Sequence, residues 1–254
     1  MKNIKLFEEA SQYEASKDGF EYPTVSYVKD IETVYYMLKP SAYEFVDLGL
    51  SVKWATCNVG ATKPEEFGLY FAWGETQGYT GITNEKQFTW ADYKWSGDED
   101  GNTMTKYPSD GSSTEGGDAA PVDMIEEDTT TLLTLLPEDD AVTTTDSSCR
   151  MPTSGECVEL TANTTSEWVD DYNGTGVAGR IFTSNVNGNS IFVPAAGICF
   201  GGSVYYVGQN GFLWSSSVYS SNVQYAFNLY FVSDDVGVSN GGRYGGLPVR
   251  AVRV

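Results

Sequence analysis

The sequence predicts an α+β fold in which short strands predominate. A hydrophobic content of 41% over 254 residues is enough for one large or two modest domains with a buried core. Many aromatic residues lie close to glycines in short strand-like runs, a pattern typical of loop-rich β structure. A helix start signal occurs at Thr153 and Glu156, between the strand-like runs.

The first forty residues form a separate module in this interpretation. Residues 6–17 place apolar and small residues at helical spacing, and Gly19 follows as a stop signal. Residues 24–38 alternate apolar and polar side chains on both sides of a central turn, as a β-hairpin does. With Pro40 as the linker, we expect a helix-plus-hairpin module at residues 1–40 and a second domain at 43–254.

The second domain begins with strand signals and continues into an insertion. Strands are expected at 45–50, 53–56 and 70–75, and the Gly, Asp, Ser and Thr content of 96–123 predicts a long surface insertion. Asp98 begins a run that resembles a calcium loop, but Thr103 stands where that loop needs glycine. We therefore expect no calcium site there.

The remaining elements follow from local signals. Thr153 and Glu156 have the spacing of a capping box, so a helix should begin there and end within 163–167. Strands are expected at 179–193, interrupted by a tight turn at 187–188, and at 195–204. Arg250 and Arg253 alternate with valines along a final strand, and we expect both to pair with acidic residues.

Charge excludes two classes of partner. With 35 acidic and 15 basic residues, the formal net charge of −20 repels nucleic-acid phosphates and anionic lipids. No run approaches the ~20 apolar residues that a membrane-spanning helix needs. The first ten residues lack the apolar core of a signal peptide. We expect no nucleic acid and no membrane insertion.

Residue types also restrict the chemistry. The absence of histidine removes the Ser-His-Asp and Cys-His nucleophile systems and most zinc sites. Neighbouring carboxylates such as Glu65, Glu66 and Glu75 are interpreted as a solvated acidic face rather than a glycosidase pair. We expect no enzyme activity, no catalytic residue, no metal and no cofactor. Four cysteines without a C-x-x-C pair are expected to be buried thiols, although an extracellular domain could pair them: Cys57, Cys149, Cys157 and Cys199.

The C-terminal segment differs from the rest of the chain in charge and composition. All ten lysines lie at or before Lys106, and the acidic residues after position 180 are Asp234 and Asp235 alone. In residues 203–247, Tyr, Ser, Gly and Asn fill 25 of 45 positions. These residue types dominate antibody binding surfaces, because tyrosine gives a large contact at low rotamer cost and the others give adaptable hydrogen bonds. The same types are also ordinary in β-rich domains, so composition alone leaves both interpretations open.

An ordered series of motifs resembles a known family. The motifs are VDLGLSVKWATCNVGATKPEEFGLYFAWGET (46–76), LPEDDA (136–141), RMPTSGE (150–156), GNSIFVPAAG (188–197), LWSSS (213–217) and LPVRAVR (247–253). They are similar to a domain of gut Bacteroidetes and their phages, in the formylglycine-generating-enzyme branch of the C-type lectin fold. In several relatives the last strands are the variable region of a diversity-generating retroelement. The resemblance implies this fold for 43–254 and a variable region at about 203–247.

A codon argument follows from the resemblance. Randomising an AAC codon at its adenines cannot yield Lys, Glu, Gln, Met or Trp, and 203–247 contains no Lys, Glu or Met. Gln209, Trp214 and Gln224 must then be fixed. Leu229, Phe231, Val236, Val238 and Val249 are expected to face the core. The expected ligand contacts are Phe212, Leu213, Tyr219, Tyr225, Phe227, Tyr230, Val232, Asp234, Asp235, Gly237, Ser239, Asn240, Gly241, Gly242, Tyr244 and Gly245.

The N-terminal module also resembles the opening of some Bacteroides phage structural proteins, which implies virion attachment or oligomerisation for residues 1–40 and, without a signal peptide, synthesis in the host cytoplasm. A hypervariable receptor-binding protein, displayed on the tail or capsid surface of a phage virion, would bind a bacterial surface protein or glycan and could trimerise. An enzyme of the formylglycine-generating type is disfavoured, because no cysteine matches its reactive site. A fixed-specificity adhesin and a calcium-independent carbohydrate-binding lectin remain the alternatives.

Overall fold

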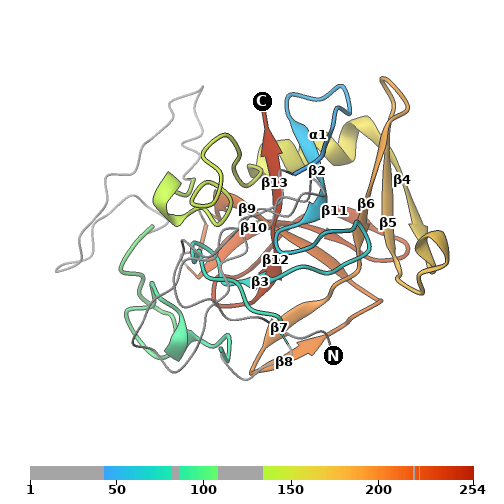
Figure 1. Cartoon of the computed structure of the whole chain (residues 1–254). Helices are drawn as coiled ribbons and strands as arrows, with labels where there is room; N and C mark the ends of the chain where they lie inside the picture. The colour runs from blue at the N-terminus through green and yellow to red at the C-terminus, as the bar shows by residue number, and fades with distance from the viewer. Residues whose placement is uncertain (1–42, 82–85, 108–133, 220, 223) are drawn as a thin grey trace, which may run out of the picture. The chain divides into compact units, whose positions relative to one another are not determined.

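The structure is a computed structural model that describes residues 43–81, 86–107, 134–219, 221–222 and 224–254 (Figure 1). The helix and hairpin expected at 1–40 lie outside these ranges, as does the part of the expected insertion from 108 onward. The described residues form mostly β sheets with one α-helix, as the sequence predicts. None of their helices is long and apolar enough to cross a bilayer.

One sheet joins the beginning of the described chain to its end. Its order is β1 (Phe45–Val46), β2 (Lys53–Asn58) and β13 (Arg250–Arg253), and both contacts with β2 are antiparallel. In Figure 1 the red strand β13 runs beside the blue strand β2. A second contact joins β3 (Tyr70–Phe71) to β12 (Leu247–Pro248). The strands expected at 45–50 and 70–75 exist but are only two residues long.

The single α-helix of the described residues, α1 (Ser154–Asn163), begins and ends where the sequence predicts. The Thr153 side chain accepts a hydrogen bond from the Glu156 N–H, and the Glu156 carboxylate accepts one from the Thr153 N–H. This reciprocal capping box satisfies two N–H groups that a helix start leaves unpaired. Three short 3-10 helices also occur in the described ranges: η2 (Trp90–Asp92), η3 (Pro137–Asp139) and η4 (Tyr172–Gly174).

The middle of the chain forms a three-stranded sheet and a separate hairpin. The sheet has the order β4 (Thr164–Val169), β5 (Gly179–Ser184) and β6 (Ser190–Pro194). The strand expected at 195–204 is instead a hairpin of β7 (Ile198–Phe200) and β8 (Ser203–Tyr205). Gly201 and Gly202 form its turn, both at positive φ, so the chain reverses where a continuous strand was expected.

The C-terminal segment forms the third sheet, with the order β11 (Val236–Gly242), β10 (Tyr225–Phe231) and β9 (Gly211–Val218). Strands β10 and β11 pair over seven consecutive positions without a shift in register. Between β10 and β9 the register shifts near Phe227, where β9 holds extra residues. The sheet therefore has one regular side, β10–β11, and one irregular side, β9.

Three hydrophobic clusters make up the core, and tryptophans lie in two of them. Trp73 and Trp214 belong to the first, and Trp54 belongs to the second, together with residues of α1 and of the C-terminal sheet. The insertion expected at 96–123 reaches this core: Met104 and Tyr107 are almost fully buried. Most of 96–107 is exposed or half-exposed, as expected of a surface segment, and Met104 and Tyr107 anchor it to the core.

Two further expectations about single residues can be compared with the structure. All four cysteines are free and buried, which confirms the prediction of buried thiols. Arg250 does not pair with an acidic residue, so that expectation is wrong. Its fully buried guanidinium donates to Asn58 Oδ1 and to the Phe192 carbonyl, at 2.9 and 2.7 Å. Burial lowers the pKa of Arg250 to about 10.

Candidate functional site

The sheet β9–β10–β11 carries most of the predicted ligand contacts, and strand alternation divides them between its two faces. Leu229 and Phe231 of β10 are fully buried in the second core cluster, which also contains Leu160 of α1. Because side chains alternate along a strand, Phe227 lies on the same face as Leu229 and Phe231, whereas Tyr230 lies on the other face. The predicted contacts therefore do not share one flat surface.

On the α1-facing side, three aromatic side chains gather beyond the end of the core. The Tyr219 ring meets the Phe227 ring edge to face at 5.2 Å and the Tyr225 ring at 6.4 Å. We call these three residues the aromatic cluster. All three are half-buried, so each retains accessible surface. Such rigid, amphipathic rings form contacts with little loss of rotamer entropy.

On the opposite side, Phe212 of β9 and Tyr230 of β10 stand directly across from each other. Their ring centroids are 5.3 Å apart, and both rings are half-buried. Gly237 of β11 is the third residue in this row, and no atom lies within 4 Å of the place where its Cβ would stand. The row therefore ends in open space on the β11 side.

The turn between β10 and β11 is held by an arginine from another sheet. Arg180 Nη2 donates to the carbonyls of Val232 and Ser233, at 2.6 and 3.1 Å, and its Nη1 donates to Ser166 Oγ at 2.9 Å. Burial lowers the pKa of Arg180, and the nearby Asp235 and Asp234 carboxylates oppose that effect. Both carboxylates are exposed to solvent. The turn thus exposes two acidic side chains on a main chain that Arg180 holds in place.

Strand β11 itself carries small residues. Ser239 and Asn240 are exposed, and Gly241 and Gly242 are partly exposed. A Cβ on Gly241 would stand 3.2 Å from Asn228 Nδ2, on the side that also holds Trp214. The Asn228 side chain is buried there, and its Oδ1 has no hydrogen-bond partner. This part of the sheet presents main chain rather than bulky side chains.

Beyond β11, Tyr244 packs against a residue that the sequence did not indicate. Its ring lies 4.6 Å from the ring of Trp90, in η2. Gln224, whose carbonyl accepts a hydrogen bond from the Arg243 N–H, donates from Nε2 to the Asp100 carbonyl at 3.2 Å. The loop 86–107 therefore borders the predicted site, and a pattern confined to 203–247 could not reveal it.

Two predicted contacts are wrong. Leu213 is fully buried in the core cluster with Leu229, because alternation turns it away from the side on which Phe212 lies. Gly245 is also buried, and a Cβ there would stand 3.4 Å from Ile198 Cδ1. Neither residue offers surface to a ligand. The other fourteen predicted contacts are half-buried or exposed.

The predicted core positions agree with the structure. Leu229, Phe231 and Val249 are fully buried, and Val236 and Val238 are partly buried against the second core cluster. Trp214, expected to be fixed, is also fully buried, and its Nε1 donates to the Phe71 carbonyl. Leu213 and Gly245 are thus the two predicted contacts that are buried, whereas the predicted core positions are buried or partly buried.

The most exposed apolar side chains of the C-terminal segment were missed. Tyr205, Tyr206 and Val207 follow one another with exposed fractions of 41%, 52% and 43%. The Tyr205 ring stacks on Phe200 with centroids 4.2 Å apart, and Tyr206 adopts a positive φ of 61°, which is uncommon for a tyrosine. The sequence signal was the unbroken run of apolar residues 204–207, which begins where the strand expected at 195–204 ends.

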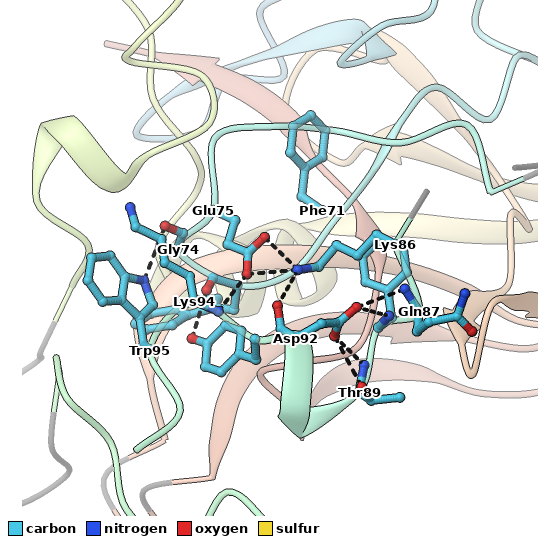
Figure 2. Close-up of polar contacts among 12 residues, drawn as sticks. Phe71, Gly74, Glu75, Lys86, Gln87, Thr89, Asp92, Lys94 and Trp95 are labelled. Carbon is cyan, nitrogen blue, oxygen red and sulfur yellow. Dashed lines mark hydrogen bonds and ion pairs between the residues drawn. The ribbon is translucent and has the colours of Figure 1, made fainter. Parts of the chain in front are cut away.

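Figure 2 shows a buried ion pair that lies outside this sheet, between Lys86 and Glu75. Lys86 Nζ lies 2.9 Å from Glu75 Oε2 and also donates to the Asp92 carbonyl oxygen at 2.8 Å. Glu75 is 8% exposed, so its expected place on a solvated face is wrong. Buried charges need such partners because desolvation is costly.

The loop around this ion pair satisfies its own polar groups. The Asp92 carboxylate accepts hydrogen bonds from the N–H groups of Gln87, Phe88 and Thr89 (Figure 2). Glu75 Oε1 accepts another from the Lys94 N–H at 2.9 Å. We interpret this cluster as the support of η2, and hence of Trp90 beneath Tyr244.

Side chains that could bind a metal ion do not cluster in the described residues. No group of three or more Cys, Asp or Glu side chains converges in the described ranges. At the run that resembled a calcium loop, the Asp98 carboxylate accepts hydrogen bonds from the N–H groups of Asp100, Asn102 and Thr103. Those bonds, with that from the Thr103 hydroxyl, lower the pKa of Asp98. The carboxylate is engaged in closing its own loop.

Comparison with known proteins gave no relative: no family model, no curated protein and no solved structure matches the chain.

Proposed function

We propose that this chain is a hypervariable receptor-binding protein with a C-type lectin fold of the formylglycine-generating-enzyme branch. Residues 203–247 would be the target of a diversity-generating retroelement, and the protein would be displayed on a phage virion to bind a bacterial surface receptor. Its ligand would contact the aromatic cluster, the Phe212–Tyr230 pair, the 232–235 turn and β11.

One observation supports this proposal: most of the proposed variable positions keep accessible surface, whereas Trp214, Leu229 and Phe231 in the same strands are buried. The outward positions hold residues that an adenine-randomised AAC codon can encode. Trp214, which such a codon cannot encode, is buried and hydrogen-bonded to Phe71. Gln224, also excluded by the codon, donates to the Asp100 carbonyl. A chain that varies its contacts while keeping its fold needs this separation, because core substitutions are costly and surface ones are tolerated.

The proposal is tested by sequencing this gene deeply in its source population, together with the adjacent locus. We expect substitutions at the fourteen outward positions, and a nearby near-copy repeat whose adenines match those codons. Leu213 and Gly245 serve as internal controls, since both lie within the segment but are buried. A segment that varies no more than residues 43–81 would contradict the proposal.

A fixed-specificity lectin is the second candidate, favoured by the exposed Tyr205 and Tyr206. Exposed aromatic faces can stack on the C–H groups of a sugar ring, and no codon-defined contact is needed. This candidate predicts that Tyr205→Ala abolishes binding to a bacterial glycan array, whereas Tyr225→Ala does not. The reverse result favours the hypervariable site.

A further inference from the structure

Strand β11 has a free edge. In the described part of the chain, β10 pairs with one side of β11 and no strand pairs with the other. Three features by which proteins protect such strands are absent: residues 236–242 contain no proline and no charged residue, and they have no bulge. An edge of this kind is a template for another extended chain.

The hydrogen bonds at the two ends of the β10–β11 pair show which main-chain groups point outward. The Val232 N–H donates to the Asp235 carbonyl at one end, and the Arg243 N–H donates to the Gln224 carbonyl at the other. Because hydrogen-bonded and non-hydrogen-bonded pairs alternate in antiparallel strands, Gly237, Ser239 and Gly241 bond to β10. The even-numbered residues of β11 therefore direct their N–H and C=O groups to the free edge.

At each end of this edge one main-chain group has a local hydrogen-bond partner, whereas the groups in the middle have none among the described residues. The Val236 N–H donates to the Asp235 carboxylate at 2.9 Å, and the Gly242 carbonyl accepts from the Gly245 N–H at 2.9 Å. Between them stand Val238 and Asn240, whose four main-chain groups bond to no described residue in the structure. The Val238 side chain packs against the core, so its main chain, not its side chain, faces a partner.

We infer that β11 binds its ligand by strand addition: an extended polypeptide segment pairs with the main chain of Val238 and Asn240. The complement of alternating N–H and C=O groups at strand spacing is another extended main chain, which favours a protein ligand over a glycan. On the Tyr230 side, the open space at Gly237 accepts an apolar side chain of the added strand. The exposed Asp234 and Asp235 favour a basic residue at that end.

This inference rests on the proposed function and deepens it. Main-chain hydrogen bonds do not depend on residue type, so they survive any substitution on β11 except proline. An AAC codon randomised at its adenines cannot encode proline without changing both adenines to cytosine. Strand addition would therefore give a constant part of the affinity, while the outward side chains give specificity.

The test uses the full chain and a displayed library of random linear peptides. Peptides that bind are synthesised and titrated against Val238→Pro, which removes an edge N–H, and against Val238→Ala, which shortens the side chain but keeps that N–H. We expect proline to weaken binding by on the order of tenfold or more, and alanine to have a much smaller effect. N-methylation along the peptide should weaken binding at every second residue only.

Amide exchange supplies a measurement that needs no variant. The Val238 and Asn240 amide protons should exchange quickly in the free protein and slow down when peptide is added. Equal effects of the two substitutions, N-methyl losses without a period of two, or a library without binders would overturn strand addition. If substitution of Phe227 weakens binding but Val238→Pro does not, the proposed receptor-binding function stands and strand addition is wrong. If strand addition is observed but residues 203–247 prove invariant in the source population, strand addition stands and the hypervariable function is wrong.

Discussion

Trp214 Nε1 donates a 2.8 Å hydrogen bond to the carbonyl of Phe71, which joins the C-terminal sheet to the segment that carries the first motif. Both residues are buried. Replacing Trp214 with phenylalanine leaves that carbonyl buried without a donor. We expect the free energy of unfolding to fall by about 1–3 kcal/mol, measured by urea denaturation. Trp168→Phe is the matched control, because its Nε1 bonds to Asp170 at the surface and should matter little.

Adjacent residues of β10 should differ sharply in their tolerance of polar substitution. Leu229→Asn places an amide in the second core cluster and should destabilise the protein by about 3–5 kcal/mol. Tyr230→Asn should change stability by about 1 kcal/mol or less, because its side chain is half-exposed. Thermal unfolding of the two variants decides the matter. Similar losses in both would mean that Tyr230 belongs to the core and not to a variable surface.

Arg180 should control the order of the turn that holds Asp234 and Asp235. Arg180→Met removes the donors to the Val232 and Ser233 carbonyls, so residues 232–236 should exchange their amide protons faster. Hydrogen exchange read by mass spectrometry measures this locally. Arg253→Met is the control, since Arg253 lies over the Phe45 ring at the surface. Unchanged exchange in the turn would show that its own hydrogen bonds suffice.

The capping box of α1 should make stability depend on acid. Burial raises the pKa of Glu156, but bonds from Arg150 and Thr153 outweigh it and hold the pKa below its usual value of 4.5. A lowered folded-state pKa stabilises the protein above the unfolded pKa, and the contribution is lost as the pH falls through the folded value.

We therefore expect Glu156→Gln to reduce stability by about 1 kcal/mol near neutral pH. The difference from the unsubstituted chain should shrink as the pH falls below about 4.5. Urea denaturation across this pH range measures it. A difference that stays constant with pH would show that the carboxylate charge does not contribute.

Gly211 should tolerate no side chain. A Cβ there would stand 1.9 Å from the Phe231 ring, which covers the glycine across the β9–β10 pair. Gly211→Ala must displace that buried ring, and we expect a loss of about 1–3 kcal/mol. Gly237→Ala is the matched control on the same sheet, because nothing lies within 4 Å of its Cβ position.

The sequence predicted those elements whose signals are local. The Thr153–Glu156 capping box marked the start of α1, which ends at Asn163, within the expected 163–167, and the turn at 187–188 separated β5 from β6. Strand β4 was not predicted, because its polar sequence becomes a strand only by pairing with β5. The N-terminal module lies outside the described residues and stays a prediction.

Within the candidate site, composition found the segment but not the direction of each side chain. Phe212 and Leu213 are equally compatible with the codon argument, yet only the strand register shows that Leu213 turns toward α1. Likewise, Trp90 joins the site through its contact with Tyr244, more than 150 positions away in the sequence. The exposure of Tyr206 was not predicted, because its positive φ cannot be inferred from residue type.

The pairing of β13 with β2 makes the fold depend on correct translation of everything between them. A frameshift or an early stop codon anywhere in residues 203–247 deletes β12 and β13. The β1–β2 sheet then loses its third strand, and Asn58 loses its bond to Arg250. Errors that corrupt the reading frame would therefore yield chains that cannot fold and are open to proteolysis, while in-frame substitutions pass. Strand β13 thus completes the first sheet only where the reading frame through 203–247 is intact.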